Sequence, residues 1–160
     1  MNDKYKKISR EQNSQLINQA AGLAVISPPK GGWIKAVRTA LAMSGAALSK
    51  RLGGHRTTAA YLERSEQDGS ITIKKMQQVA HAMHCRFVYA LVPETIPNGE
   101  TTVESIIEAQ AERKARSIIR QASTHMALEA QQLTKEQNER EVQRLKQQLI
   151  TEIPKDFWED

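Results

Sequence analysis

The sequence predicts an all-α protein with a core of four short helices, a short β-strand at the end of that core, and additional N- and C-terminal helices. Two observations support this fold class. Of the 160 residues, 26% are charged and only 4% are aromatic, and this composition favours helices. Apolar residues also recur at every third or fourth position through most of the chain, which is the spacing of one helical face. A chain of this length excludes a large multi-domain enzyme.

The first helix is predicted over residues 8–24, where Leu16 and Leu23 lie on one helical face. Residues 27–32 then interrupt it, because they include two prolines, which lack an N–H, and two glycines, which favour a turn. We therefore expect residues 1–27 to form a separate N-terminal helix.

Four helices are predicted in close succession after this interruption. Ser44 is suited to cap the second of them, and a pair of glycines ends it. The third has His55 at its start, and an Asp-Gly turn precedes the fourth. Their predicted ranges are residues 33–42, 45–52, 56–64 and 71–83.

Residues 86–92 are rich in β-branched and aromatic side chains and stop at Pro93, a pattern that predicts a short strand. A single strand has unpaired backbone groups, so it needs a partner strand from this chain or from a second copy. A strand that joins two copies and a buried extended segment without a role in assembly fit the sequence equally well.

Two longer helices are predicted after the strand, over residues 101–132 and 134–150. Thr134 and Gln137 have the spacing of a capping box. The tail, residues 156–160, combines two large aromatic rings with three acids, and can serve as an anchor on another surface or as a contact with the chain's own core. The predicted divisions of the chain are residues 1–27, 28–93 and 94–160.

The net charge of +5 is unevenly distributed. Residues 28–93 carry ten Lys and Arg against three Asp and Glu, a net charge of +7, whereas residues 94–160 carry nine against thirteen, a net charge of −4. Concentrated positive charge is typical of nucleic-acid-binding domains. The acidic C-terminal part favours a protein-facing role, although a charged helical face often contacts only solvent.

Residues 45–64 have the features of a helix-turn-helix, whose second helix enters the major groove of DNA. Small residues and a turn glycine are needed where the two helices cross, and Ala47, Ser49 and Gly53 meet this need. We expect Arg56 to read bases, because Arg can bond to both acceptors of guanine, and Lys74 to contact phosphate. An ordinary helical hairpin with a solvated face is the alternative. The predicted DNA-binding residues are Ser44, His55, Arg56, Thr57, Thr58, Ala60, Tyr61 and Lys74.

Five segments carry a family resemblance: Pro28–Arg38, Leu41–Gly45, Leu62–Ser65, Phe87–Pro93 and Met126–Ala130. They resemble the family called mobile mystery protein A, and the four helices look like the lambda-repressor-like, or Xre-type, helix-turn-helix domain. In that wider group an Arg of the first helix pairs with a Glu of the recognition helix. The resemblance therefore implies a structural ion pair between Arg38 and Glu63. Gly54 and Ala59 depart from the family pattern, since both are smaller than the residues usual there.

Members of this family are encoded beside mobile mystery protein B, which carries a Fic domain, a fold associated with AMP transfer to proteins. The resemblance implies a DNA-binding transcriptional regulator, an autorepressing antitoxin-like partner of a Fic-domain toxin. Two-fold symmetry predicts a homodimer on a double-stranded DNA operator. Antitoxins that block Fic sites directly often carry a Ser/Thr-x-x-x-Glu-Gly/Asn helix, but no Glu here precedes Gly or Asn. The alternative is a protein-binding module that neutralises a partner mainly through its C-terminal helices.

The sequence contains no glycine-rich phosphate loop, nucleophile elbow or acidic metal-binding string, so we expect no enzyme activity and no cofactor. His81, His84 and Cys85 could bind a metal, but a fourth ligand is not apparent and these residues equally suit the surface and end of a helix. No apolar run approaches the roughly 20 residues that span a bilayer, and no secretory signal is apparent. We expect a cytoplasmic protein with no membrane partner.

Overall fold

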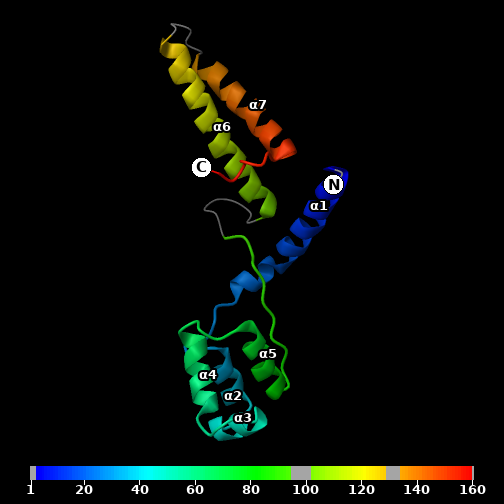
Figure 1. Cartoon of the computed structure of the whole chain (residues 1–160), viewed down its shortest axis with the longest axis vertical. Coiled ribbons are helices and arrows are strands. Elements are labelled where there is room, and N and C mark those ends of the chain that lie inside the picture. The colour runs from blue at the N-terminus through cyan, green and yellow to red at the C-terminus, as the bar shows by residue number, and fades with distance from the viewer. Residues whose placement is uncertain (1–2, 95–101, 129–133, 160) are drawn as a thin grey trace. The chain divides into compact units, whose positions relative to one another are not determined.

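The computed structural model describes residues 3–94, 102–128 and 134–159. All regular secondary structure in these residues is helical, which confirms the predicted all-α class. The 3₁₀-helix η1 (Ala21–Val25) directly follows the first α-helix. The α-helices are α1 (Asp3–Ala20), α2 (Trp33–Ala40), α3 (Gly45–Arg51), α4 (Thr58–Gln67), α5 (Ile73–Ala82), α6 (Val103–Leu128) and α7 (Lys135–Glu152) (Figure 1).

The chain forms two compact units. The central unit is Gly22–Ala90, and the terminal unit joins Met1–Ala21 to Leu91–Asp160. Helix α1 therefore belongs with α6, which it contacts, whereas the sequence suggests a separate N-terminal helix.

An apolar core between α2, α3, α4 and α5 holds the central unit together. Burying a side chain the size of Leu, Ile or Val stabilises a fold by about 1.5–3 kcal/mol. Two apolar residues of the predicted helices, Leu41 and Ile73, are about half exposed because they lie at helix ends. The buried core residues are Ile34, Leu48, Ala59, Leu62, Val79 and Met83.

Helix α2 begins against a carboxylate from α4. Glu66 accepts hydrogen bonds from the backbone N–H groups of Trp33 and Ile34, at 2.6 and 2.9 Å. These N–H groups have no partner within α2, and a negative charge also suits the helix N-terminus. Gly32 makes the approach possible: its φ is +83°, and a Cβ there would lie 2.7 Å from a Glu66 carboxylate oxygen. A glycine that the sequence places in a turn is therefore also part of a cap.

The C-terminus of α5 is held by a side chain from α3. The Arg51 guanidinium donates to the carbonyl oxygen of Ala82, at 2.5 Å, and to Nε2 of His84, at 2.7 Å. Since Arg can only donate, Nε2 of His84 accepts and its ring proton is on Nδ1. His84 has a φ of +56° and terminates the helix.

The predicted strand over residues 86–92 is not present. This stretch has no regular secondary structure, and no other described segment pairs with it. Its central-unit part, residues 86–90, runs as an extended trace beside α5 (Figure 1). A β-ladder requires two strands, and the described parts of this single chain supply only one candidate.

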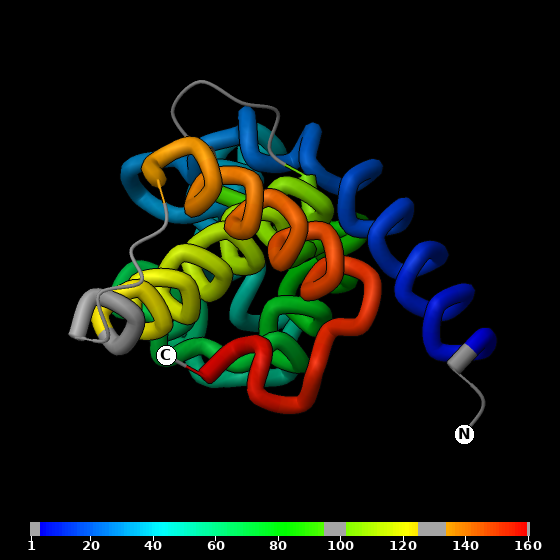
Figure 2. Tube along the Cα trace, turned by 90° about the horizontal axis from the view of Figure 1, so that it is seen from above, coloured from blue at the N-terminus to red at the C-terminus, as the bar shows by residue number. Residues whose placement is uncertain are grey.

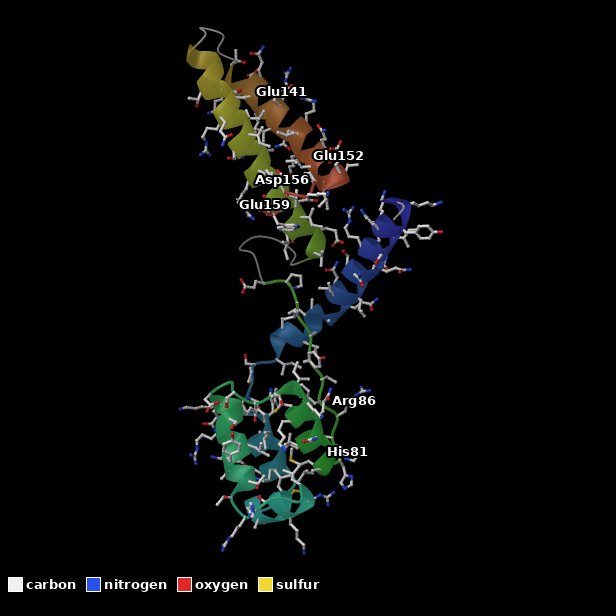
Figure 3. All side chains as sticks on the ribbon, viewed as in Figure 1. His81, Arg86, Glu141, Glu152, Asp156 and Glu159 are labelled. Atoms are coloured by element: carbon white, nitrogen blue, oxygen red, sulfur yellow. The ribbon has the colours of Figure 1, made fainter. Side chains whose placement is uncertain are left out.

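In the terminal unit, α6 and α7 lie side by side (Figure 2). Thr134 and Gln137 form the predicted capping box at the start of α7. The two aromatic residues of the tail differ in burial. Phe157 is fully buried in the core of this hairpin, whereas Trp158 is 56% exposed. Figure 3 shows that Asp156 and Glu159, on either side of the two rings, lie near α6. The buried core residues are Ala111, Ala115, Val142, Leu149 and Phe157.

Ion pairs link α6 to α7 on the hairpin surface. Arg116 of α6 pairs with Glu139 of α7 at 2.9 Å, and Glu112 of α6 pairs with Lys146 of α7 at 3.2 Å. Hydrogen bonds from Arg116 and then Lys146 lower the pKa of Glu112. Exposed pairs of this kind contribute little individually, so the apolar seam is the main source of hairpin stability.

Helix α1 caps α6 through one side chain. The Asn18 amide oxygen accepts from the backbone N–H of Val103, at 3.0 Å, and the Asn18 amide nitrogen donates to Glu104, at 2.8 Å. The hydrogen bond from Asn18 lowers the pKa of Glu104. Two segments that are distant in sequence are thus joined at a helix terminus, where backbone N–H groups need partners.

Substituting Gly32 with Ala should destabilise the central unit by about 2–4 kcal/mol, because the methyl group adds backbone strain and displaces the Glu66 cap. Gly69→Ala is the matched control: Gly69 has a φ of +76°, but a Cβ there would meet nothing within 4 Å. Urea unfolding followed by Trp33 fluorescence, in a Trp158→Phe background, measures both. Equal losses for the two variants would show that the Glu66 cap contributes nothing.

Candidate nucleic-acid interface

Helices α3 and α4 are joined by a short turn, residues 52–57. Ser44 caps α3 as predicted, its hydroxyl oxygen accepting from the backbone N–H of Ala47 at 3.1 Å. After α3 the chain reverses at Gly53, whose φ of +67° is a conformation that glycine adopts without strain. The turn then carries His55 and Arg56, which are both exposed.

Helix α4 begins at Thr58, two residues later than the sequence predicts. Arg56 therefore lies in the turn and not in the helix, and Thr57 is the N-cap residue. Thr57 makes no side-chain capping bond. The N-terminus of α4 must find another partner for its N–H groups.

Ser49 of α3 supplies that partner. Its hydroxyl oxygen accepts from the backbone N–H of Ala59 at 2.9 Å and donates to the backbone carbonyl of Arg56 at 3.3 Å. Ser49 is 1% exposed, so both bonds are shielded from water. The sequence suggests only that Ser49 is small enough for a helix crossing. Its hydroxyl also links α3 to the turn and to the first turn of α4.

The helix crossing uses Ser49, as predicted, and Gly45 in place of Ala47. Ala47 is exposed, whereas a Cβ at Gly45 would lie 3.9 Å from the Cβ of Ala59, in ordinary contact. The space at position 54 accommodates only a glycine, because a Cβ there would lie 2.5 Å from the Thr58 hydroxyl. The two departures from the family pattern, Gly54 and Ala59, therefore both lie at close contacts between α3, the turn and α4.

One face of α4 contacts solvent. Ala60 and Tyr61 are exposed as the predicted site requires, and Tyr61 is 65% exposed. Arg64, one helical turn further along, is also exposed and was not identified from the sequence. Its position three residues after Tyr61 is the signal that could have identified it. Thr58 is partly buried because its side chain lies beside Gly54.

Arg38 and Glu63 form the ion pair that the family resemblance implies. Arg38 Nε lies 2.6 Å from Glu63 Oε1, and the two side chains are 18% and 14% exposed. A second guanidinium nitrogen of Arg38 donates to the backbone carbonyl of Met43 at 3.0 Å. The pair joins α2 to α4 and fixes the side of α4 that faces the core.

The three acidic residues of the central unit make internal contacts. Glu63 pairs with Arg38, and Glu66 caps α2. Asp68 accepts from the backbone N–H of Ser70, and hydrogen bonds from Ser70 lower the Asp68 pKa. No ion pair in the described part of the chain involves the exposed Lys50, Arg51, Arg56, Arg64 or Lys74.

Lys74 lies on a different element from the other candidate residues. It is exposed in the first turn of α5, after the N-cap Thr72, whose hydroxyl accepts from the backbone N–H of Lys75.

In the described residues, no three His, Cys, Asp or Glu side chains come together as a metal site would require. His84 uses its Nε2 for Arg51 instead.

Comparisons with protein-family models, curated proteins and solved structures find no match to this chain. No helix within the described residues is both long enough and apolar enough to cross a membrane.

Replacing Ser49 with Ala should cost about 1–3 kcal/mol of stability, since it leaves the buried N–H of Ala59 without a partner. Ser27→Ala is the control, because Ser27 is an exposed serine of the same unit. Urea unfolding with the Trp33 probe gives both values. A loss below about 0.5 kcal/mol for the Ser49 variant would indicate that another group satisfies this N–H.

Proposed function

We propose that the central unit binds double-stranded DNA sequence-specifically, with α3 and α4 as a helix-turn-helix and α4 as the recognition helix. One observation carries the proposal: in the part of the chain that the structure describes, the exposed Arg56 and Arg64 form no ion pair, while all three carboxylates of the unit make internal contacts. DNA carries one negative charge per about 1.7 Å of its axis, so such a surface attracts it.

The exposed side chains suit two kinds of DNA contact. Arg56 and Arg64 can bond to guanine edges, and Tyr61 can reach a base or a phosphate. Lys74 and the N-terminus of α3 at Ser44 can contact phosphate and set the position of the domain. Ser49, by joining the turn to α3, keeps the base-reading residues in register with these contacts.

The biological role that we propose follows the family resemblance. The protein is a transcriptional regulator that binds the promoter of its own operon as a homodimer, with a Fic-domain protein as its partner. Two helix-turn-helix units on one two-fold axis read half-sites about one helical turn apart. The partner then adjusts the extent of repression.

Two substitutions separate base reading from phosphate contact. Arg56→Ala should reduce the preference for promoter DNA over scrambled DNA by about 1–3 kcal/mol, because a base contact is lost. Lys74→Ala should weaken binding to both duplexes and reduce the slope of log affinity against log salt by about 0.9. Fluorescence anisotropy at two salt concentrations, with the DNA directly upstream of the coding sequence, measures both effects.

Lys135→Ala is the charge-matched control. Lys135 is an exposed lysine of α7 in the terminal unit, so its loss should leave binding and salt slope close to those of the unmodified protein. If the unmodified protein bound promoter and scrambled DNA with equal affinity, the operator proposal would fail.

A second, compatible function is supported by Trp158. This ring is 56% exposed although the neighbouring Phe157 is fully buried, and it packs edge to face on Phe157 at a centroid distance of 4.9 Å. A large aromatic residue held rigidly at the surface is typical of protein-binding hot spots. We propose that the α6–α7 hairpin docks the partner protein through this ring.

Trp158→Ala should weaken capture of the co-expressed Fic-domain protein roughly thirtyfold or more, which is the effect of a hot-spot truncation of about 2 kcal/mol. Tyr5→Ala removes another exposed aromatic ring of the terminal unit and should have no such effect. Pull-down followed by titration calorimetry measures both. Unchanged affinity for the Trp158 variant would exclude this docking site.

A further inference from the structure

The extended segment after α5, residues 86–90, has an unpaired edge. In the part of the chain that the structure describes, no hydrogen bond involves the backbone N–H or C=O groups of these five residues. Phe87, Val88 and Tyr89 are residue types that favour strands. An extended stretch with unpaired donors and acceptors is a template for a second strand.

The segment borders an apolar cavity on one side. It forms one wall of this cavity of about 550 Å³, whose other walls are residues 23–28, α2 and α5. The rings of Phe87 and Tyr89 stack at a centroid distance of 5.6 Å. Figure 3 shows Arg86 on the same segment, beside α5.

Apolar side chains of the segment remain exposed. Val88 is 57% exposed and Tyr89 62%. The alternative of a buried extended segment therefore does not describe the single chain. Exposed apolar side chains beside unpaired backbone groups require an occupant that supplies both a strand edge and apolar contacts.

We propose that this occupant is a second copy of the chain, and that residues 86–90 of the two copies pair as antiparallel strands about a two-fold axis at Val88. Each copy has the same unpaired segment, so each supplies the strand that the other lacks. Such a contact is isologous and closes at two copies. It leaves no complementary surface for a third.

The side chains favour this register. With the axis at Val88, the two Val88 side chains face each other, and Phe87 faces Tyr89 of the second copy, which is a favourable aromatic cross-strand pair. Arg86 faces Ala90 of the second copy. The two Arg86 residues then lie at opposite ends, roughly 14 Å apart along the strands, so their charges do not oppose each other directly. The inference rests on the proposed function in one respect: the dimer formed by this pairing is the one that would bind two half-sites.

Cysteine cross-linking in a Cys85→Ser background tests the register. Val88→Cys should form an intermolecular disulfide rapidly, because directly opposite residues have Cα atoms about 4.5–5.5 Å apart, within disulfide range. Ala90→Cys is the matched control, since two Ala90 residues would lie roughly 14 Å apart in this register and cannot be bridged. Cross-linking at the two positions at equal rates would overturn the register.

The oligomeric state tests the pairing itself. The unmodified protein should sediment as a dimer, and Val88→Lys should convert it to a monomer with unchanged helix content, because two like charges would then face each other. An unmodified protein that is monomeric at micromolar concentration, or a Val88→Lys variant that remains dimeric, would overturn the inference. A dimer without promoter preference would defeat only the operator proposal. A promoter-selective monomer would defeat the strand pairing and the homodimer, but would leave sequence-specific DNA binding by α4 standing.

Discussion

Capping of one helix by the side chain of another is the constraint on which the central unit depends. Its helices have only seven to ten residues, and helices this short are not stable alone in water. Glu66 of α4 caps α2, Ser49 of α3 caps α4, and Arg51 of α3 caps α5. Each cap satisfies a backbone group and also fixes the angle between two helices. The apolar core supplies most of the stability, while the caps determine which face of α4 meets solvent.

Much of the fold could be predicted from the sequence, because apolar periodicity and local signals are properties of neighbouring residues. Ser44 and the Thr134 capping box act within a few positions of their own helices, and both were identified. The caps made by Glu66 and Ser49 were not, since their partners lie 32 or 33 and 10 positions away in the sequence. The start of α4 was misplaced for the same reason. Arg56 has adequate helix propensity, but Ser49 binds its carbonyl within the turn.

The charge of the candidate interface could also be predicted from the sequence only in part. The sequence establishes a net charge of +7 over residues 28–93, but it does not establish which cations remain available to a partner. Glu63 is joined to Arg38, and Glu66 to the N-terminus of α2. Asp68, four residues after Arg64, accepts from Ser70, and its pKa is lowered first by Ser70 and to a smaller extent by the charge of Arg64. The tertiary fold thus uses the carboxylates of α4 for structure and leaves its exposed face cationic, a distribution that no count of charges reveals.

The same contacts connect the candidate DNA-binding face to the proposed dimer strand. Ser49 and Arg51 are two residues apart on α3: Ser49 binds the turn and α4, and Arg51 binds the end of α5. His84, which Arg51 also contacts, lies two residues before the extended segment. A short series of hydrogen bonds therefore runs from α4 through α3 to His84, two residues before that segment. If two copies join at Val88, the spacing of their α4 helices follows from contacts within each chain, and a half-site spacing can be fixed without a long dimerisation helix.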